Sequence, residues 1–373
     1  MEVRSRWSVI CYANCGKTDS PIAVEADSAM IIFDSRQTRF PLGAVKQGDI
    51  RIEPMRIVLC YPVEPHHKEQ IQAAAPDAEI IDAGQEYIAQ ELPQADIFIG
   101  HAKVPVPWAQ VVRTGRLKWI QSSAAGLDHC LVPEVVNSEI VVTGASGLFA
   151  NQVAEQTLAL LLGLVRCLPT FFRAQLKKEF IRRPTGDLHG KTVGIIGFGG
   201  NGRRIAEVLA PFQVRILATD LYVHDKPSQV EQLLPAERMA DVLSASDVVI
   251  LCVPLTKQTR GFFAAPQFAA MKEGSLLINV ARGEVVVEKD LVTALESGRL
   301  AGAGLDVTEV EPLPQSSKLW ERDDVIITPH VGAQSARRVD DSTDLACENL
   351  RRYFAGQPLL HLVDKQLGFA PPI

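Results

Sequence analysis

The chain has 373 residues, of which 47% are hydrophobic and 22% are charged. This length allows two separate hydrophobic cores, and the composition is ordinary for a globular enzyme. The formal net charge of −6 argues against a protein that binds nucleic acid through its phosphates. No apolar run reaches the ~20 residues of a membrane-spanning helix. We therefore expect neither a nucleic acid nor a membrane as partner.

The seven cysteines are scattered along the chain. Cys11 and Cys15 have no matching Cys or His pair at zinc spacing, so we expect no metal site. Cys60 and Cys252 stand inside apolar runs that are typical of buried strands. Reduced, structural cysteines of this kind indicate a cytoplasmic protein.

Residues 1–54 differ from the rest, because charges, prolines and short apolar pieces follow one another without regular alternation. Such a segment has too little apolar surface to offset the entropy of ordering it. We expect a loosely attached or disordered N-terminal extension, or a start assigned too early, with Met55 as the true initiator. The alternative is that 29–33 and 50–52 add edge strands to the first domain.

From residue 55 onward, short apolar runs alternate with amphipathic stretches, which predicts α/β structure. One helix is expected over 151–168, and a last helix over 333–354 returns to the first domain. Other helices are expected over 69–75 and 87–92. Buried parallel strands are expected at 56–61, 78–83, 97–100, 118–121, 140–145, 192–197, 214–220, 248–254, 275–281, 301–307 and 325–330. Two such series of strands indicate two doubly wound parallel-sheet domains.

The segment KTVGIIGFGGNGRRIAEVLAPF places Gly197, Gly199 and Gly202 in a G-x-G-x-x-G arrangement between a strand and a helix. Asp220 closes the next strand, 23 positions after the first glycine. The glycines allow a tight turn, close approach of a pyrophosphate and close helix packing, and the helix N-terminus attracts the phosphates. An acidic residue at position 220 can bind ribose hydroxyls and repel a 2′-phosphate. The motif therefore predicts a dinucleotide site that prefers NAD to NADP.

From about Lys118 to Ala333 the chain resembles the D-isomer-specific 2-hydroxyacid dehydrogenases. The similar segments, in the family's order, are LKWIQSSAAGLDH, NQVAEQTLALLLGLVR, LHGKTVGIIGFGGNGRRIA, VPLTKQTRGFF, LINVARGEVVVEKDLVTAL, GAGLDVTEVEPLP and VIITPHVGAQS. The resemblance implies hydride transfer between NAD and C2 of a small D-2-hydroxy or 2-keto acid. It also implies a Rossmann cofactor domain, 153–332, inserted in a flavodoxin-like substrate domain, 55–152 and 333–373.

By resemblance, three residues form the active site: Arg282 binds the substrate, Glu311 orients the histidine, and His330 is the catalytic acid/base. The chemistry independently needs these residue types. A guanidinium fixes the carboxylate and polarises the carbonyl. A histidine beside a carboxylate can stay protonated near neutral pH and deliver a proton to the carbonyl oxygen.

The resemblance extends to residues around this triad. Ala125 and Gly126 match a turn whose backbone N–H groups hold the substrate carboxylate. Further cofactor contacts are implied for Gly200, Asn201, Val253, Pro254, Val280, Ala281, Arg282, Asp306, His330 and Gly332. Of the other histidines, His66 and His67 are expected to face solvent, and His129 lies near the site without an expected substrate contact.

Phosphoglycerate dehydrogenases of this family tend to hold the substrate phosphate with arginines of the first domain. The comparable positions here are His101 and Ser122, with Lys103 as a partial substitute. The segment LKWIQSSAAGLDH looks more like the glyoxylate/hydroxypyruvate reductase branch, which favours a small unphosphorylated acid. D-3-phosphoglycerate dehydrogenase stays open as the alternative.

Two other function classes also stay open. One is a non-catalytic, NAD-sensing binding protein similar to the corepressors of this family, which the complete triad disfavours. The other is a hydrolase of the S-adenosyl-homocysteine type, which would leave the segments around Arg282 and His330 unexplained. The resemblance and the apolar stretch 153–168 further predict a homodimer.

Overall fold

The structure, a computed structural model, describes residues 54–223 and 225–371. The predictions for the segment before residue 54 lie outside the described residues. Two parallel sheets form, one of five strands and one of seven, and apolar clusters cover both faces of each sheet. This confirms the predicted class of two parallel-sheet α/β domains.

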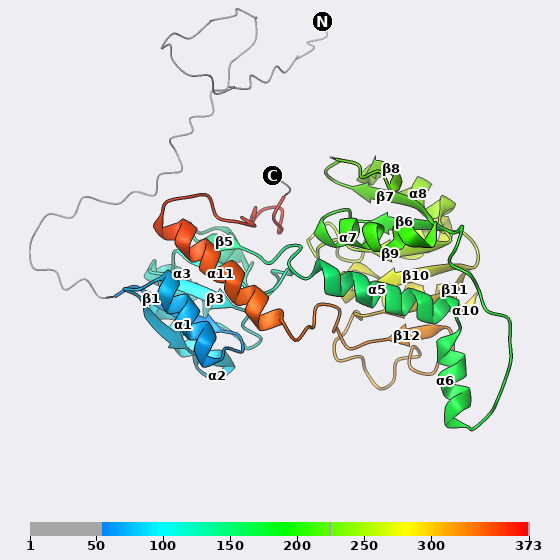
Figure 1. Cartoon of the computed structure of the whole chain (residues 1–373), viewed down its shortest axis with the longest axis horizontal. Coiled ribbons are helices and arrows are strands. Elements are labelled where there is room, and N and C mark those ends of the chain that lie inside the picture. Colours follow the sequence, from blue (N-terminus) through cyan, green and yellow to red (C-terminus); the bar gives the residue numbers. More distant parts are fainter. Residues whose placement is uncertain (1–53, 224, 372–373) are drawn as a thin grey trace, which may run out of the picture. The chain divides into compact units, whose positions relative to one another are not determined.

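The five-stranded sheet has the order β2-β1-β3-β4-β5. Helices α1 and α11 lie side by side on one of its faces (Figure 1). Side chains alternate between its faces: in β1, Ile57 and Leu59 pack with helices α1 and α11, whereas Val58 packs with α3. The elements are β1 (Arg56–Cys60), α1 (Pro65–Ala74), β2 (Glu79–Asp82), α2 (Gly84–Glu91), η1 (Leu92–Gln94), β3 (Ile97–Gly100), α3 (Trp108–Thr114), β4 (Trp119–Ser122), α4 (Pro133–Val136), β5 (Val141–Thr143) and, near the C-terminus, α11 (Arg338–Phe354).

The seven-stranded sheet has the order β12-β11-β10-β9-β6-β7-β8. Helices α5 and α7 cover one face, and α8, α9 and α10 cover the other. The elements are α5 (Ala150–Val165), α6 (Leu168–Leu176), β6 (Thr192–Ile196), α7 (Gly200–Leu209), η2 (Ala210–Phe212), β7 (Arg215–Asp220), β8 (Val230–Pro235), η3 (Ala236–Arg238), α8 (Met239–Ala245), β9 (Val248–Leu251), α9 (Ala265–Ala270), β10 (Ser275–Asn279), η4 (Gly283–Val285), α10 (Glu288–Glu296), β11 (Leu300–Leu305) and β12 (Val325–Ile327).

All strand pairs of this sheet are parallel, so the carboxyl ends of its strands meet at one edge. Gly197 follows β6, Asp220 ends β7, Arg282 follows β10 and Asp306 follows β11. The topology thus brings most of the predicted site residues to the edge where α/β sheets bind ligands.

The predicted single helix over 151–168 is wrong at its C-terminal end. Helix α5 ends at Val165, and Cys167 has a left-handed backbone with a φ of 55°. Pro169 lies in the first turn of α6. A proline lacks the N–H that a continuing helix needs and its ring clashes with the preceding turn, so a new helix starts there.

Other boundaries also differ from the prediction. Helix α11 begins at Arg338 rather than at 333, and α1 begins at Pro65 rather than at 69. The predicted strand 78–83 is half-exposed rather than buried, because β2 is an edge strand. Strand β8, also at an edge, was not predicted. The predicted strands all form, with ends displaced by at most three residues.

The prediction that His67 faces solvent is wrong, because α11 packs against α1 and covers it. Only 3% of the His67 surface is exposed. Its Nδ1 accepts the backbone N–H of Glu64 at 3.0 Å, so its Nε2 carries the proton and donates to Asp340 at 2.8 Å. His66 remains exposed.

No single helix in the described ranges has both the length and the apolar character to cross a membrane. Helices α5 and α6 reach that length only as a pair bent by 72°.

Candidate active site

The glycine-rich loop has the shape that a pyrophosphate requires. Gly197 follows β6 with a φ of +93°, and a Cβ there would lie 2.9 Å from the Cys252 carbonyl carbon. A Cβ at Gly202 would lie 2.3 Å from the Gly197 carbonyl oxygen, whereas a Cβ at Gly199 would meet no atom within 4 Å. Helix α7 begins at Gly200, so its first N–H groups lie beside this open space. These features fit a dinucleotide cradle.

Asp220 connects this loop to the end of β7. Its Oδ2 accepts the backbone N–H of Phe198 at 2.5 Å, and its Oδ1 accepts that of Tyr222 at 2.9 Å. Each carboxylate oxygen has a second lone pair, so the carboxylate can still accept a ribose hydroxyl.

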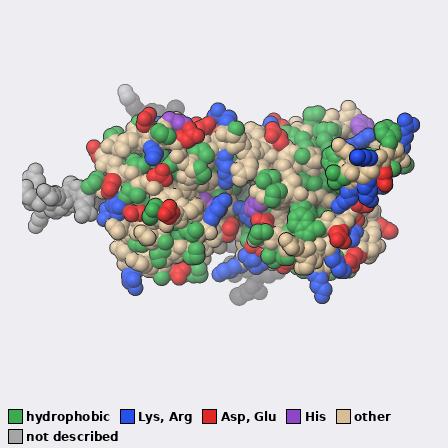
Figure 2. All heavy atoms as spheres, turned by 90° about the horizontal axis from the view of Figure 1, so that it is seen from below, with side chains coloured by type: hydrophobic (Ala, Val, Ile, Leu, Met, Phe, Trp, Pro, Cys, Tyr) green, Lys and Arg blue, Asp and Glu red, His purple; other side chains and the backbone are tan. Residues whose placement is uncertain are grey.

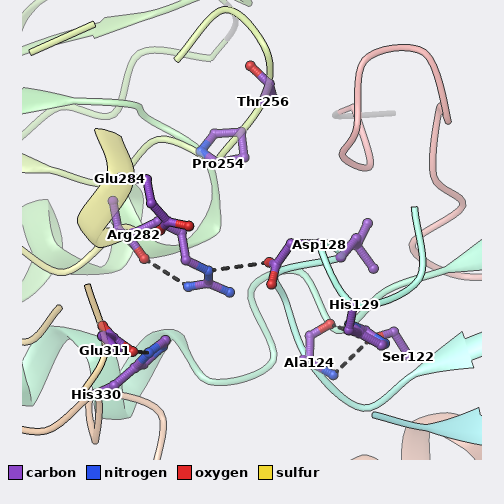
Figure 3. Close-up of polar contacts among 12 residues, drawn as sticks. Ser122, Ala124, Asp128, His129, Pro254, Thr256, Arg282, Glu284, Glu311 and His330 are labelled. Carbon is purple, nitrogen blue, oxygen red and sulfur yellow. Dashed lines mark hydrogen bonds and ion pairs between the residues drawn. The ribbon is translucent and has the colours of Figure 1, made fainter. Parts of the chain in front are cut away.

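The side chains of His330 and Glu311 form a hydrogen-bonded pair (Figure 3). The Nδ1 of His330 lies 2.9 Å from the Oε2 of Glu311. A carboxylate can only accept a hydrogen bond, so Nδ1 carries the proton and Nε2 is left for a substrate. The second Glu311 oxygen accepts the backbone N–H of Thr308 at 3.2 Å, which fixes the carboxylate.

Asp306, which is 3% exposed, holds the backbone around His330 in place. The Asp306 carboxylate accepts the N–H groups of Val331 at 3.0 Å and Gly332 at 2.8 Å, and the Thr328 hydroxyl at 2.7 Å. His330 has a φ of +54°, which is rare for a residue with a side chain. These bonds on both sides of His330 maintain that conformation and aim the imidazole.

Arg282 follows β10 on a turn that Asn279 shapes, since the Asn279 side chain bonds both Ala281 N–H and Arg282 C=O at 3.1 Å. The Arg282 guanidinium donates to Ala281 C=O at 2.8 Å, and its Nε lies 3.6 Å from Asp128 Oδ1 (Figure 3). A Cβ at Gly126 would lie 1.6 Å from Nη2. Only glycine at position 126 therefore admits the guanidinium in this place.

The predicted site residues line a single cleft, with the exception of Gly202, which faces the strand side of the loop. The lining includes Ala125, Gly126, Gly197, Gly199, Gly200, Asn201, Asp220, Val253, Pro254, Val280, Ala281, Arg282, Asp306, Glu311, His330 and Gly332. The phosphate cradle and the triad thus line one cleft.

The rings of His101 and His129 stack in this cleft, with centroids 4.0 Å apart and planes at 14°. Burial, followed by the neighbouring His101, lowers the pKa of His129 to about 3, and burial also lowers the pKa of His101. Both rings are therefore neutral near pH 7. Ser122, in contrast, is buried, and its hydroxyl accepts the Ala124 N–H at 3.1 Å.

Three charged residues that line the cleft had no predicted role: Asp128, Arg203 and Arg338. Partial burial acts to raise the pKa of Asp128, but the charge of Arg282, a backbone hydrogen bond and the neighbouring histidines together lower that pKa below its usual value. Asp128 could have been found, because it stands two residues after Gly126 in the AAGLDH segment. Arg338 has no local signal, because only the packing of α11 brings it to the cleft.

Residues 158–332 match the family described as D-isomer specific 2-hydroxyacid dehydrogenase, NAD binding domain. A glyoxylate reductase of Pyrococcus furiosus is 35% identical over 263 residues, which cover 68% of this chain and 77% of the relative. A D-isomer specific 2-hydroxyacid dehydrogenase of Xanthobacter autotrophicus, solved with NADPH and MES, superposes with a TM-score of 0.72 at 30% identity, covering 85% of this chain and 100% of its own.

A solved NADPH-dependent glyoxylate/hydroxypyruvate reductase of Sinorhizobium meliloti has a TM-score of 0.73 at 27% identity, over 84% of this chain and 100% of its own. These similarities agree with the phosphate cradle and the cleft in pointing to a nicotinamide-dependent enzyme of small hydroxy or keto acids. The chain belongs to the D-isomer-specific 2-hydroxyacid dehydrogenase family.

Proposed function

We propose that this chain transfers a hydride between NAD(H) and C2 of a small, unphosphorylated D-2-hydroxy or 2-oxo acid. The observation that carries the proposal is the His330–Glu311 pair, which lines the same cleft as Arg282 and the glycine-rich loop. The bound nicotinamide would supply or accept the hydride. The chain's own residues then have to bind the acid, orient it and move one proton.

Arg282 is proposed to bind the substrate carboxylate and polarise the C2 carbonyl. Its guanidinium is 24% exposed and carries a permanent charge. Backbone N–H groups at Ala125 and Gly126 would complete the carboxylate site. Because a Cβ at Gly126 would collide with Nη2, this glycine and Arg282 act as a unit.

His330 is proposed to protonate the carbonyl oxygen from Nε2 during reduction and to take the proton back during oxidation. Glu311 holds Nδ1–H, which fixes the tautomer and stabilises the imidazolium. Asp306 would position this imidazole through the backbone of Val331 and Gly332, beside the nicotinamide.

We propose NAD rather than NADP as the preferred cofactor. The Asp220 carboxylate stands where a 2′-phosphate would be repelled. Residues 221–223 contain no arginine or lysine, and the cleft-lining Arg203 directs its Nη1 to the carbonyl of Asp225 at 2.8 Å. Relatives solved with NADPH make this a point for direct measurement.

The proposed domain limits are 55–152 with 333–373 for the substrate domain and 153–332 for the cofactor domain. We propose no nucleic-acid or membrane partner. The net charge of −6 and the interspersed acidic and basic side chains on the face in Figure 2 support this. A cytoplasmic location is supported by the five described cysteines, all free thiols.

A homodimer is also proposed, with its support on a different helix from the predicted one. The apolar side of α5 packs against α7 and the sheet. In contrast, α6 and the segment after it expose Leu168, Phe172, Leu176, Phe180 and Ile181. A cluster of large exposed apolar side chains is typical of a protein–protein interface. Light scattering at micromolar concentration should give twice 40.7 kDa, and a 40.7 kDa particle would contradict the dimer.

The experiment is a steady-state assay with NADH and NADPH against glyoxylate, hydroxypyruvate, pyruvate and 3-phosphohydroxypyruvate. We expect turnover of unphosphorylated acids with NADH. Arg282→Gln should lower kcat/KM by roughly 10²-fold, whereas Arg260→Gln, an exposed arginine of the same domain, should leave it unchanged. Absence of turnover, or equal activity of Arg282→Gln, would reject the proposal.

A further inference from the structure

The cleft holds more positive charge than one carboxylate requires. Besides Arg282, the side chains of Lys103 and Arg338 line it, and both belong to the substrate domain. The charges of Lys103, Arg338 and Arg282 all reach His101, because each of them lowers its pKa after burial has done so. The three cations line the same cleft as the His101–His129 stack and lie near enough to His101 to affect it.

The guanidinium of Arg338 keeps N–H donors that a ligand could use. Its Nη1 donates to Ala333 C=O at 3.0 Å, and its guanidinium lies 4.8 Å from the centroid of the Phe149 ring. Burial lowers the pKa of Arg338, so the charge is only partly hydrated. Within residues 54–223 and 225–371, no carboxylate forms an ion pair with Arg338 or with Lys103. A half-buried cation such as Arg338 is costly without a counter-charge unless a ligand supplies one.

The charges of the side chains near His101 in the cleft can be summed. Asp128 offsets one of the three cations, and its pairing with Arg282 leaves a net charge of about two positive units. The negative charge of Glu311 is neutralised by His330 when the imidazole is protonated. The neutral His101 and His129 add no charge but offer hydrogen-bonding ring nitrogens. A monocarboxylate would neutralise only one of the remaining charges.

We infer that the preferred substrate is a 2-oxo dicarboxylate, whose second carboxylate binds between Lys103 and Arg338 beside His101. This inference rests on the proposed function, in which Arg282 binds the first carboxylate. A carboxylate fits better than a phosphate, because the first carboxylate leaves about one positive unit, which a second carboxylate balances, whereas a phosphate would bring a charge of about −1.5 to −2.

The test compares acids of equal chain length that differ in the terminal group. With NADH, kcat/KM is measured for oxaloacetate against 2-oxobutyrate, and for 3-phosphohydroxypyruvate against hydroxypyruvate. Calorimetry of succinate against butyrate, binding to the protein with saturating NAD, measures the same preference without turnover. We expect the dicarboxylate to be preferred roughly tenfold to a hundredfold, the usual size of a charge-assisted hydrogen bond.

The variants Lys103→Met and Arg338→Met should each reduce this preference, and Arg338→Lys should restore part of it. Lys103 is exposed, so its replacement does not threaten the fold. Arg337→Met is the matched control, because Arg337 is exposed, pairs with Asp341 and does not line the cleft. That control should keep the full preference.

Three results would overturn the inference. They are equal kcat/KM for oxaloacetate and 2-oxobutyrate, a preference that survives in both Lys103→Met and Arg338→Met, and a preference confined to the phosphorylated acid. If no 2-oxo acid is reduced at all, the proposed function fails instead. The calorimetric comparison of succinate with butyrate then decides on the second carboxylate site by itself.

Discussion

Replacement of Gly126 by alanine tests the contact between the substrate turn and the catalytic arginine. The added Cβ would lie 1.6 Å from Nη2 of Arg282. An ordinary contact is about 3.5 Å, so the guanidinium has to move by roughly 2 Å. A displacement of about 1 Å can already cost roughly 10²-fold in rate, because the substrate is no longer aligned. We expect Gly126→Ala to lower kcat/KM by at least about 10²-fold.

The same substitution should hardly change the free energy of unfolding. The atoms that must move are the end of a long side chain, and Gly126 has no positive φ that an alanine would strain. Gly144→Ala is the control, since its Cβ would meet Leu127 at an ordinary 3.5 Å. Kinetics and thermal unfolding of both variants check the reasoning. Unchanged kcat/KM in Gly126→Ala would refute it, and so would a large loss of Tm with no specific loss of activity.

Three further predictions concern His330, Asp220 and His129. His330→Ala should keep NADH binding, measured by fluorescence titration, while kcat falls roughly 10²- to 10⁴-fold; equal kcat would remove His330 from the mechanism. Asp220→Ala should raise KM for NADH and spare or improve the use of NADPH, and a parent enzyme that already prefers NADPH would contradict the role of Asp220. The pKa of His129 falls from an ordinary 6.5 to about 3 on burial, so the folded protein binds fewer protons there and stability rises with pH between these values. His129→Gln should flatten that slope in urea titrations while the exposed His189→Gln keeps it, and an unchanged slope in His129→Gln would contradict the account.

Local patterns predicted the features that depend on a few neighbouring residues. Gly197 and Asp220 lie 23 positions apart, and a strand, a turn and a helix between them leave little freedom. The buried strands could also be predicted from the sequence, because short apolar runs between helices rarely form any other structure.

Features that depend on contacts between residues far apart in the chain could not be predicted from the sequence. His67 and Asp340 are separated by 273 positions, and only the packing of α11 on α1 makes the histidine buried. Arg338 reaches the cleft for the same reason. The end of α5 at Val165 was missed because the apolar pattern continues past it, although Pro169 carried the signal.

The central claim, hydride transfer from NADH to C2 of a small 2-oxo acid to give a D-2-hydroxy acid, is tested most directly with NADH that carries two deuterium atoms at C4 of the nicotinamide. The full chain is incubated with this cofactor and a 2-oxo acid, and the product is analysed by mass spectrometry and chiral chromatography. The account predicts a D-2-hydroxy acid with deuterium at C2, formed by the parent and lost in His330→Ala. An L-hydroxy acid, a product without deuterium at C2, or equal yield from His330→Ala would contradict it.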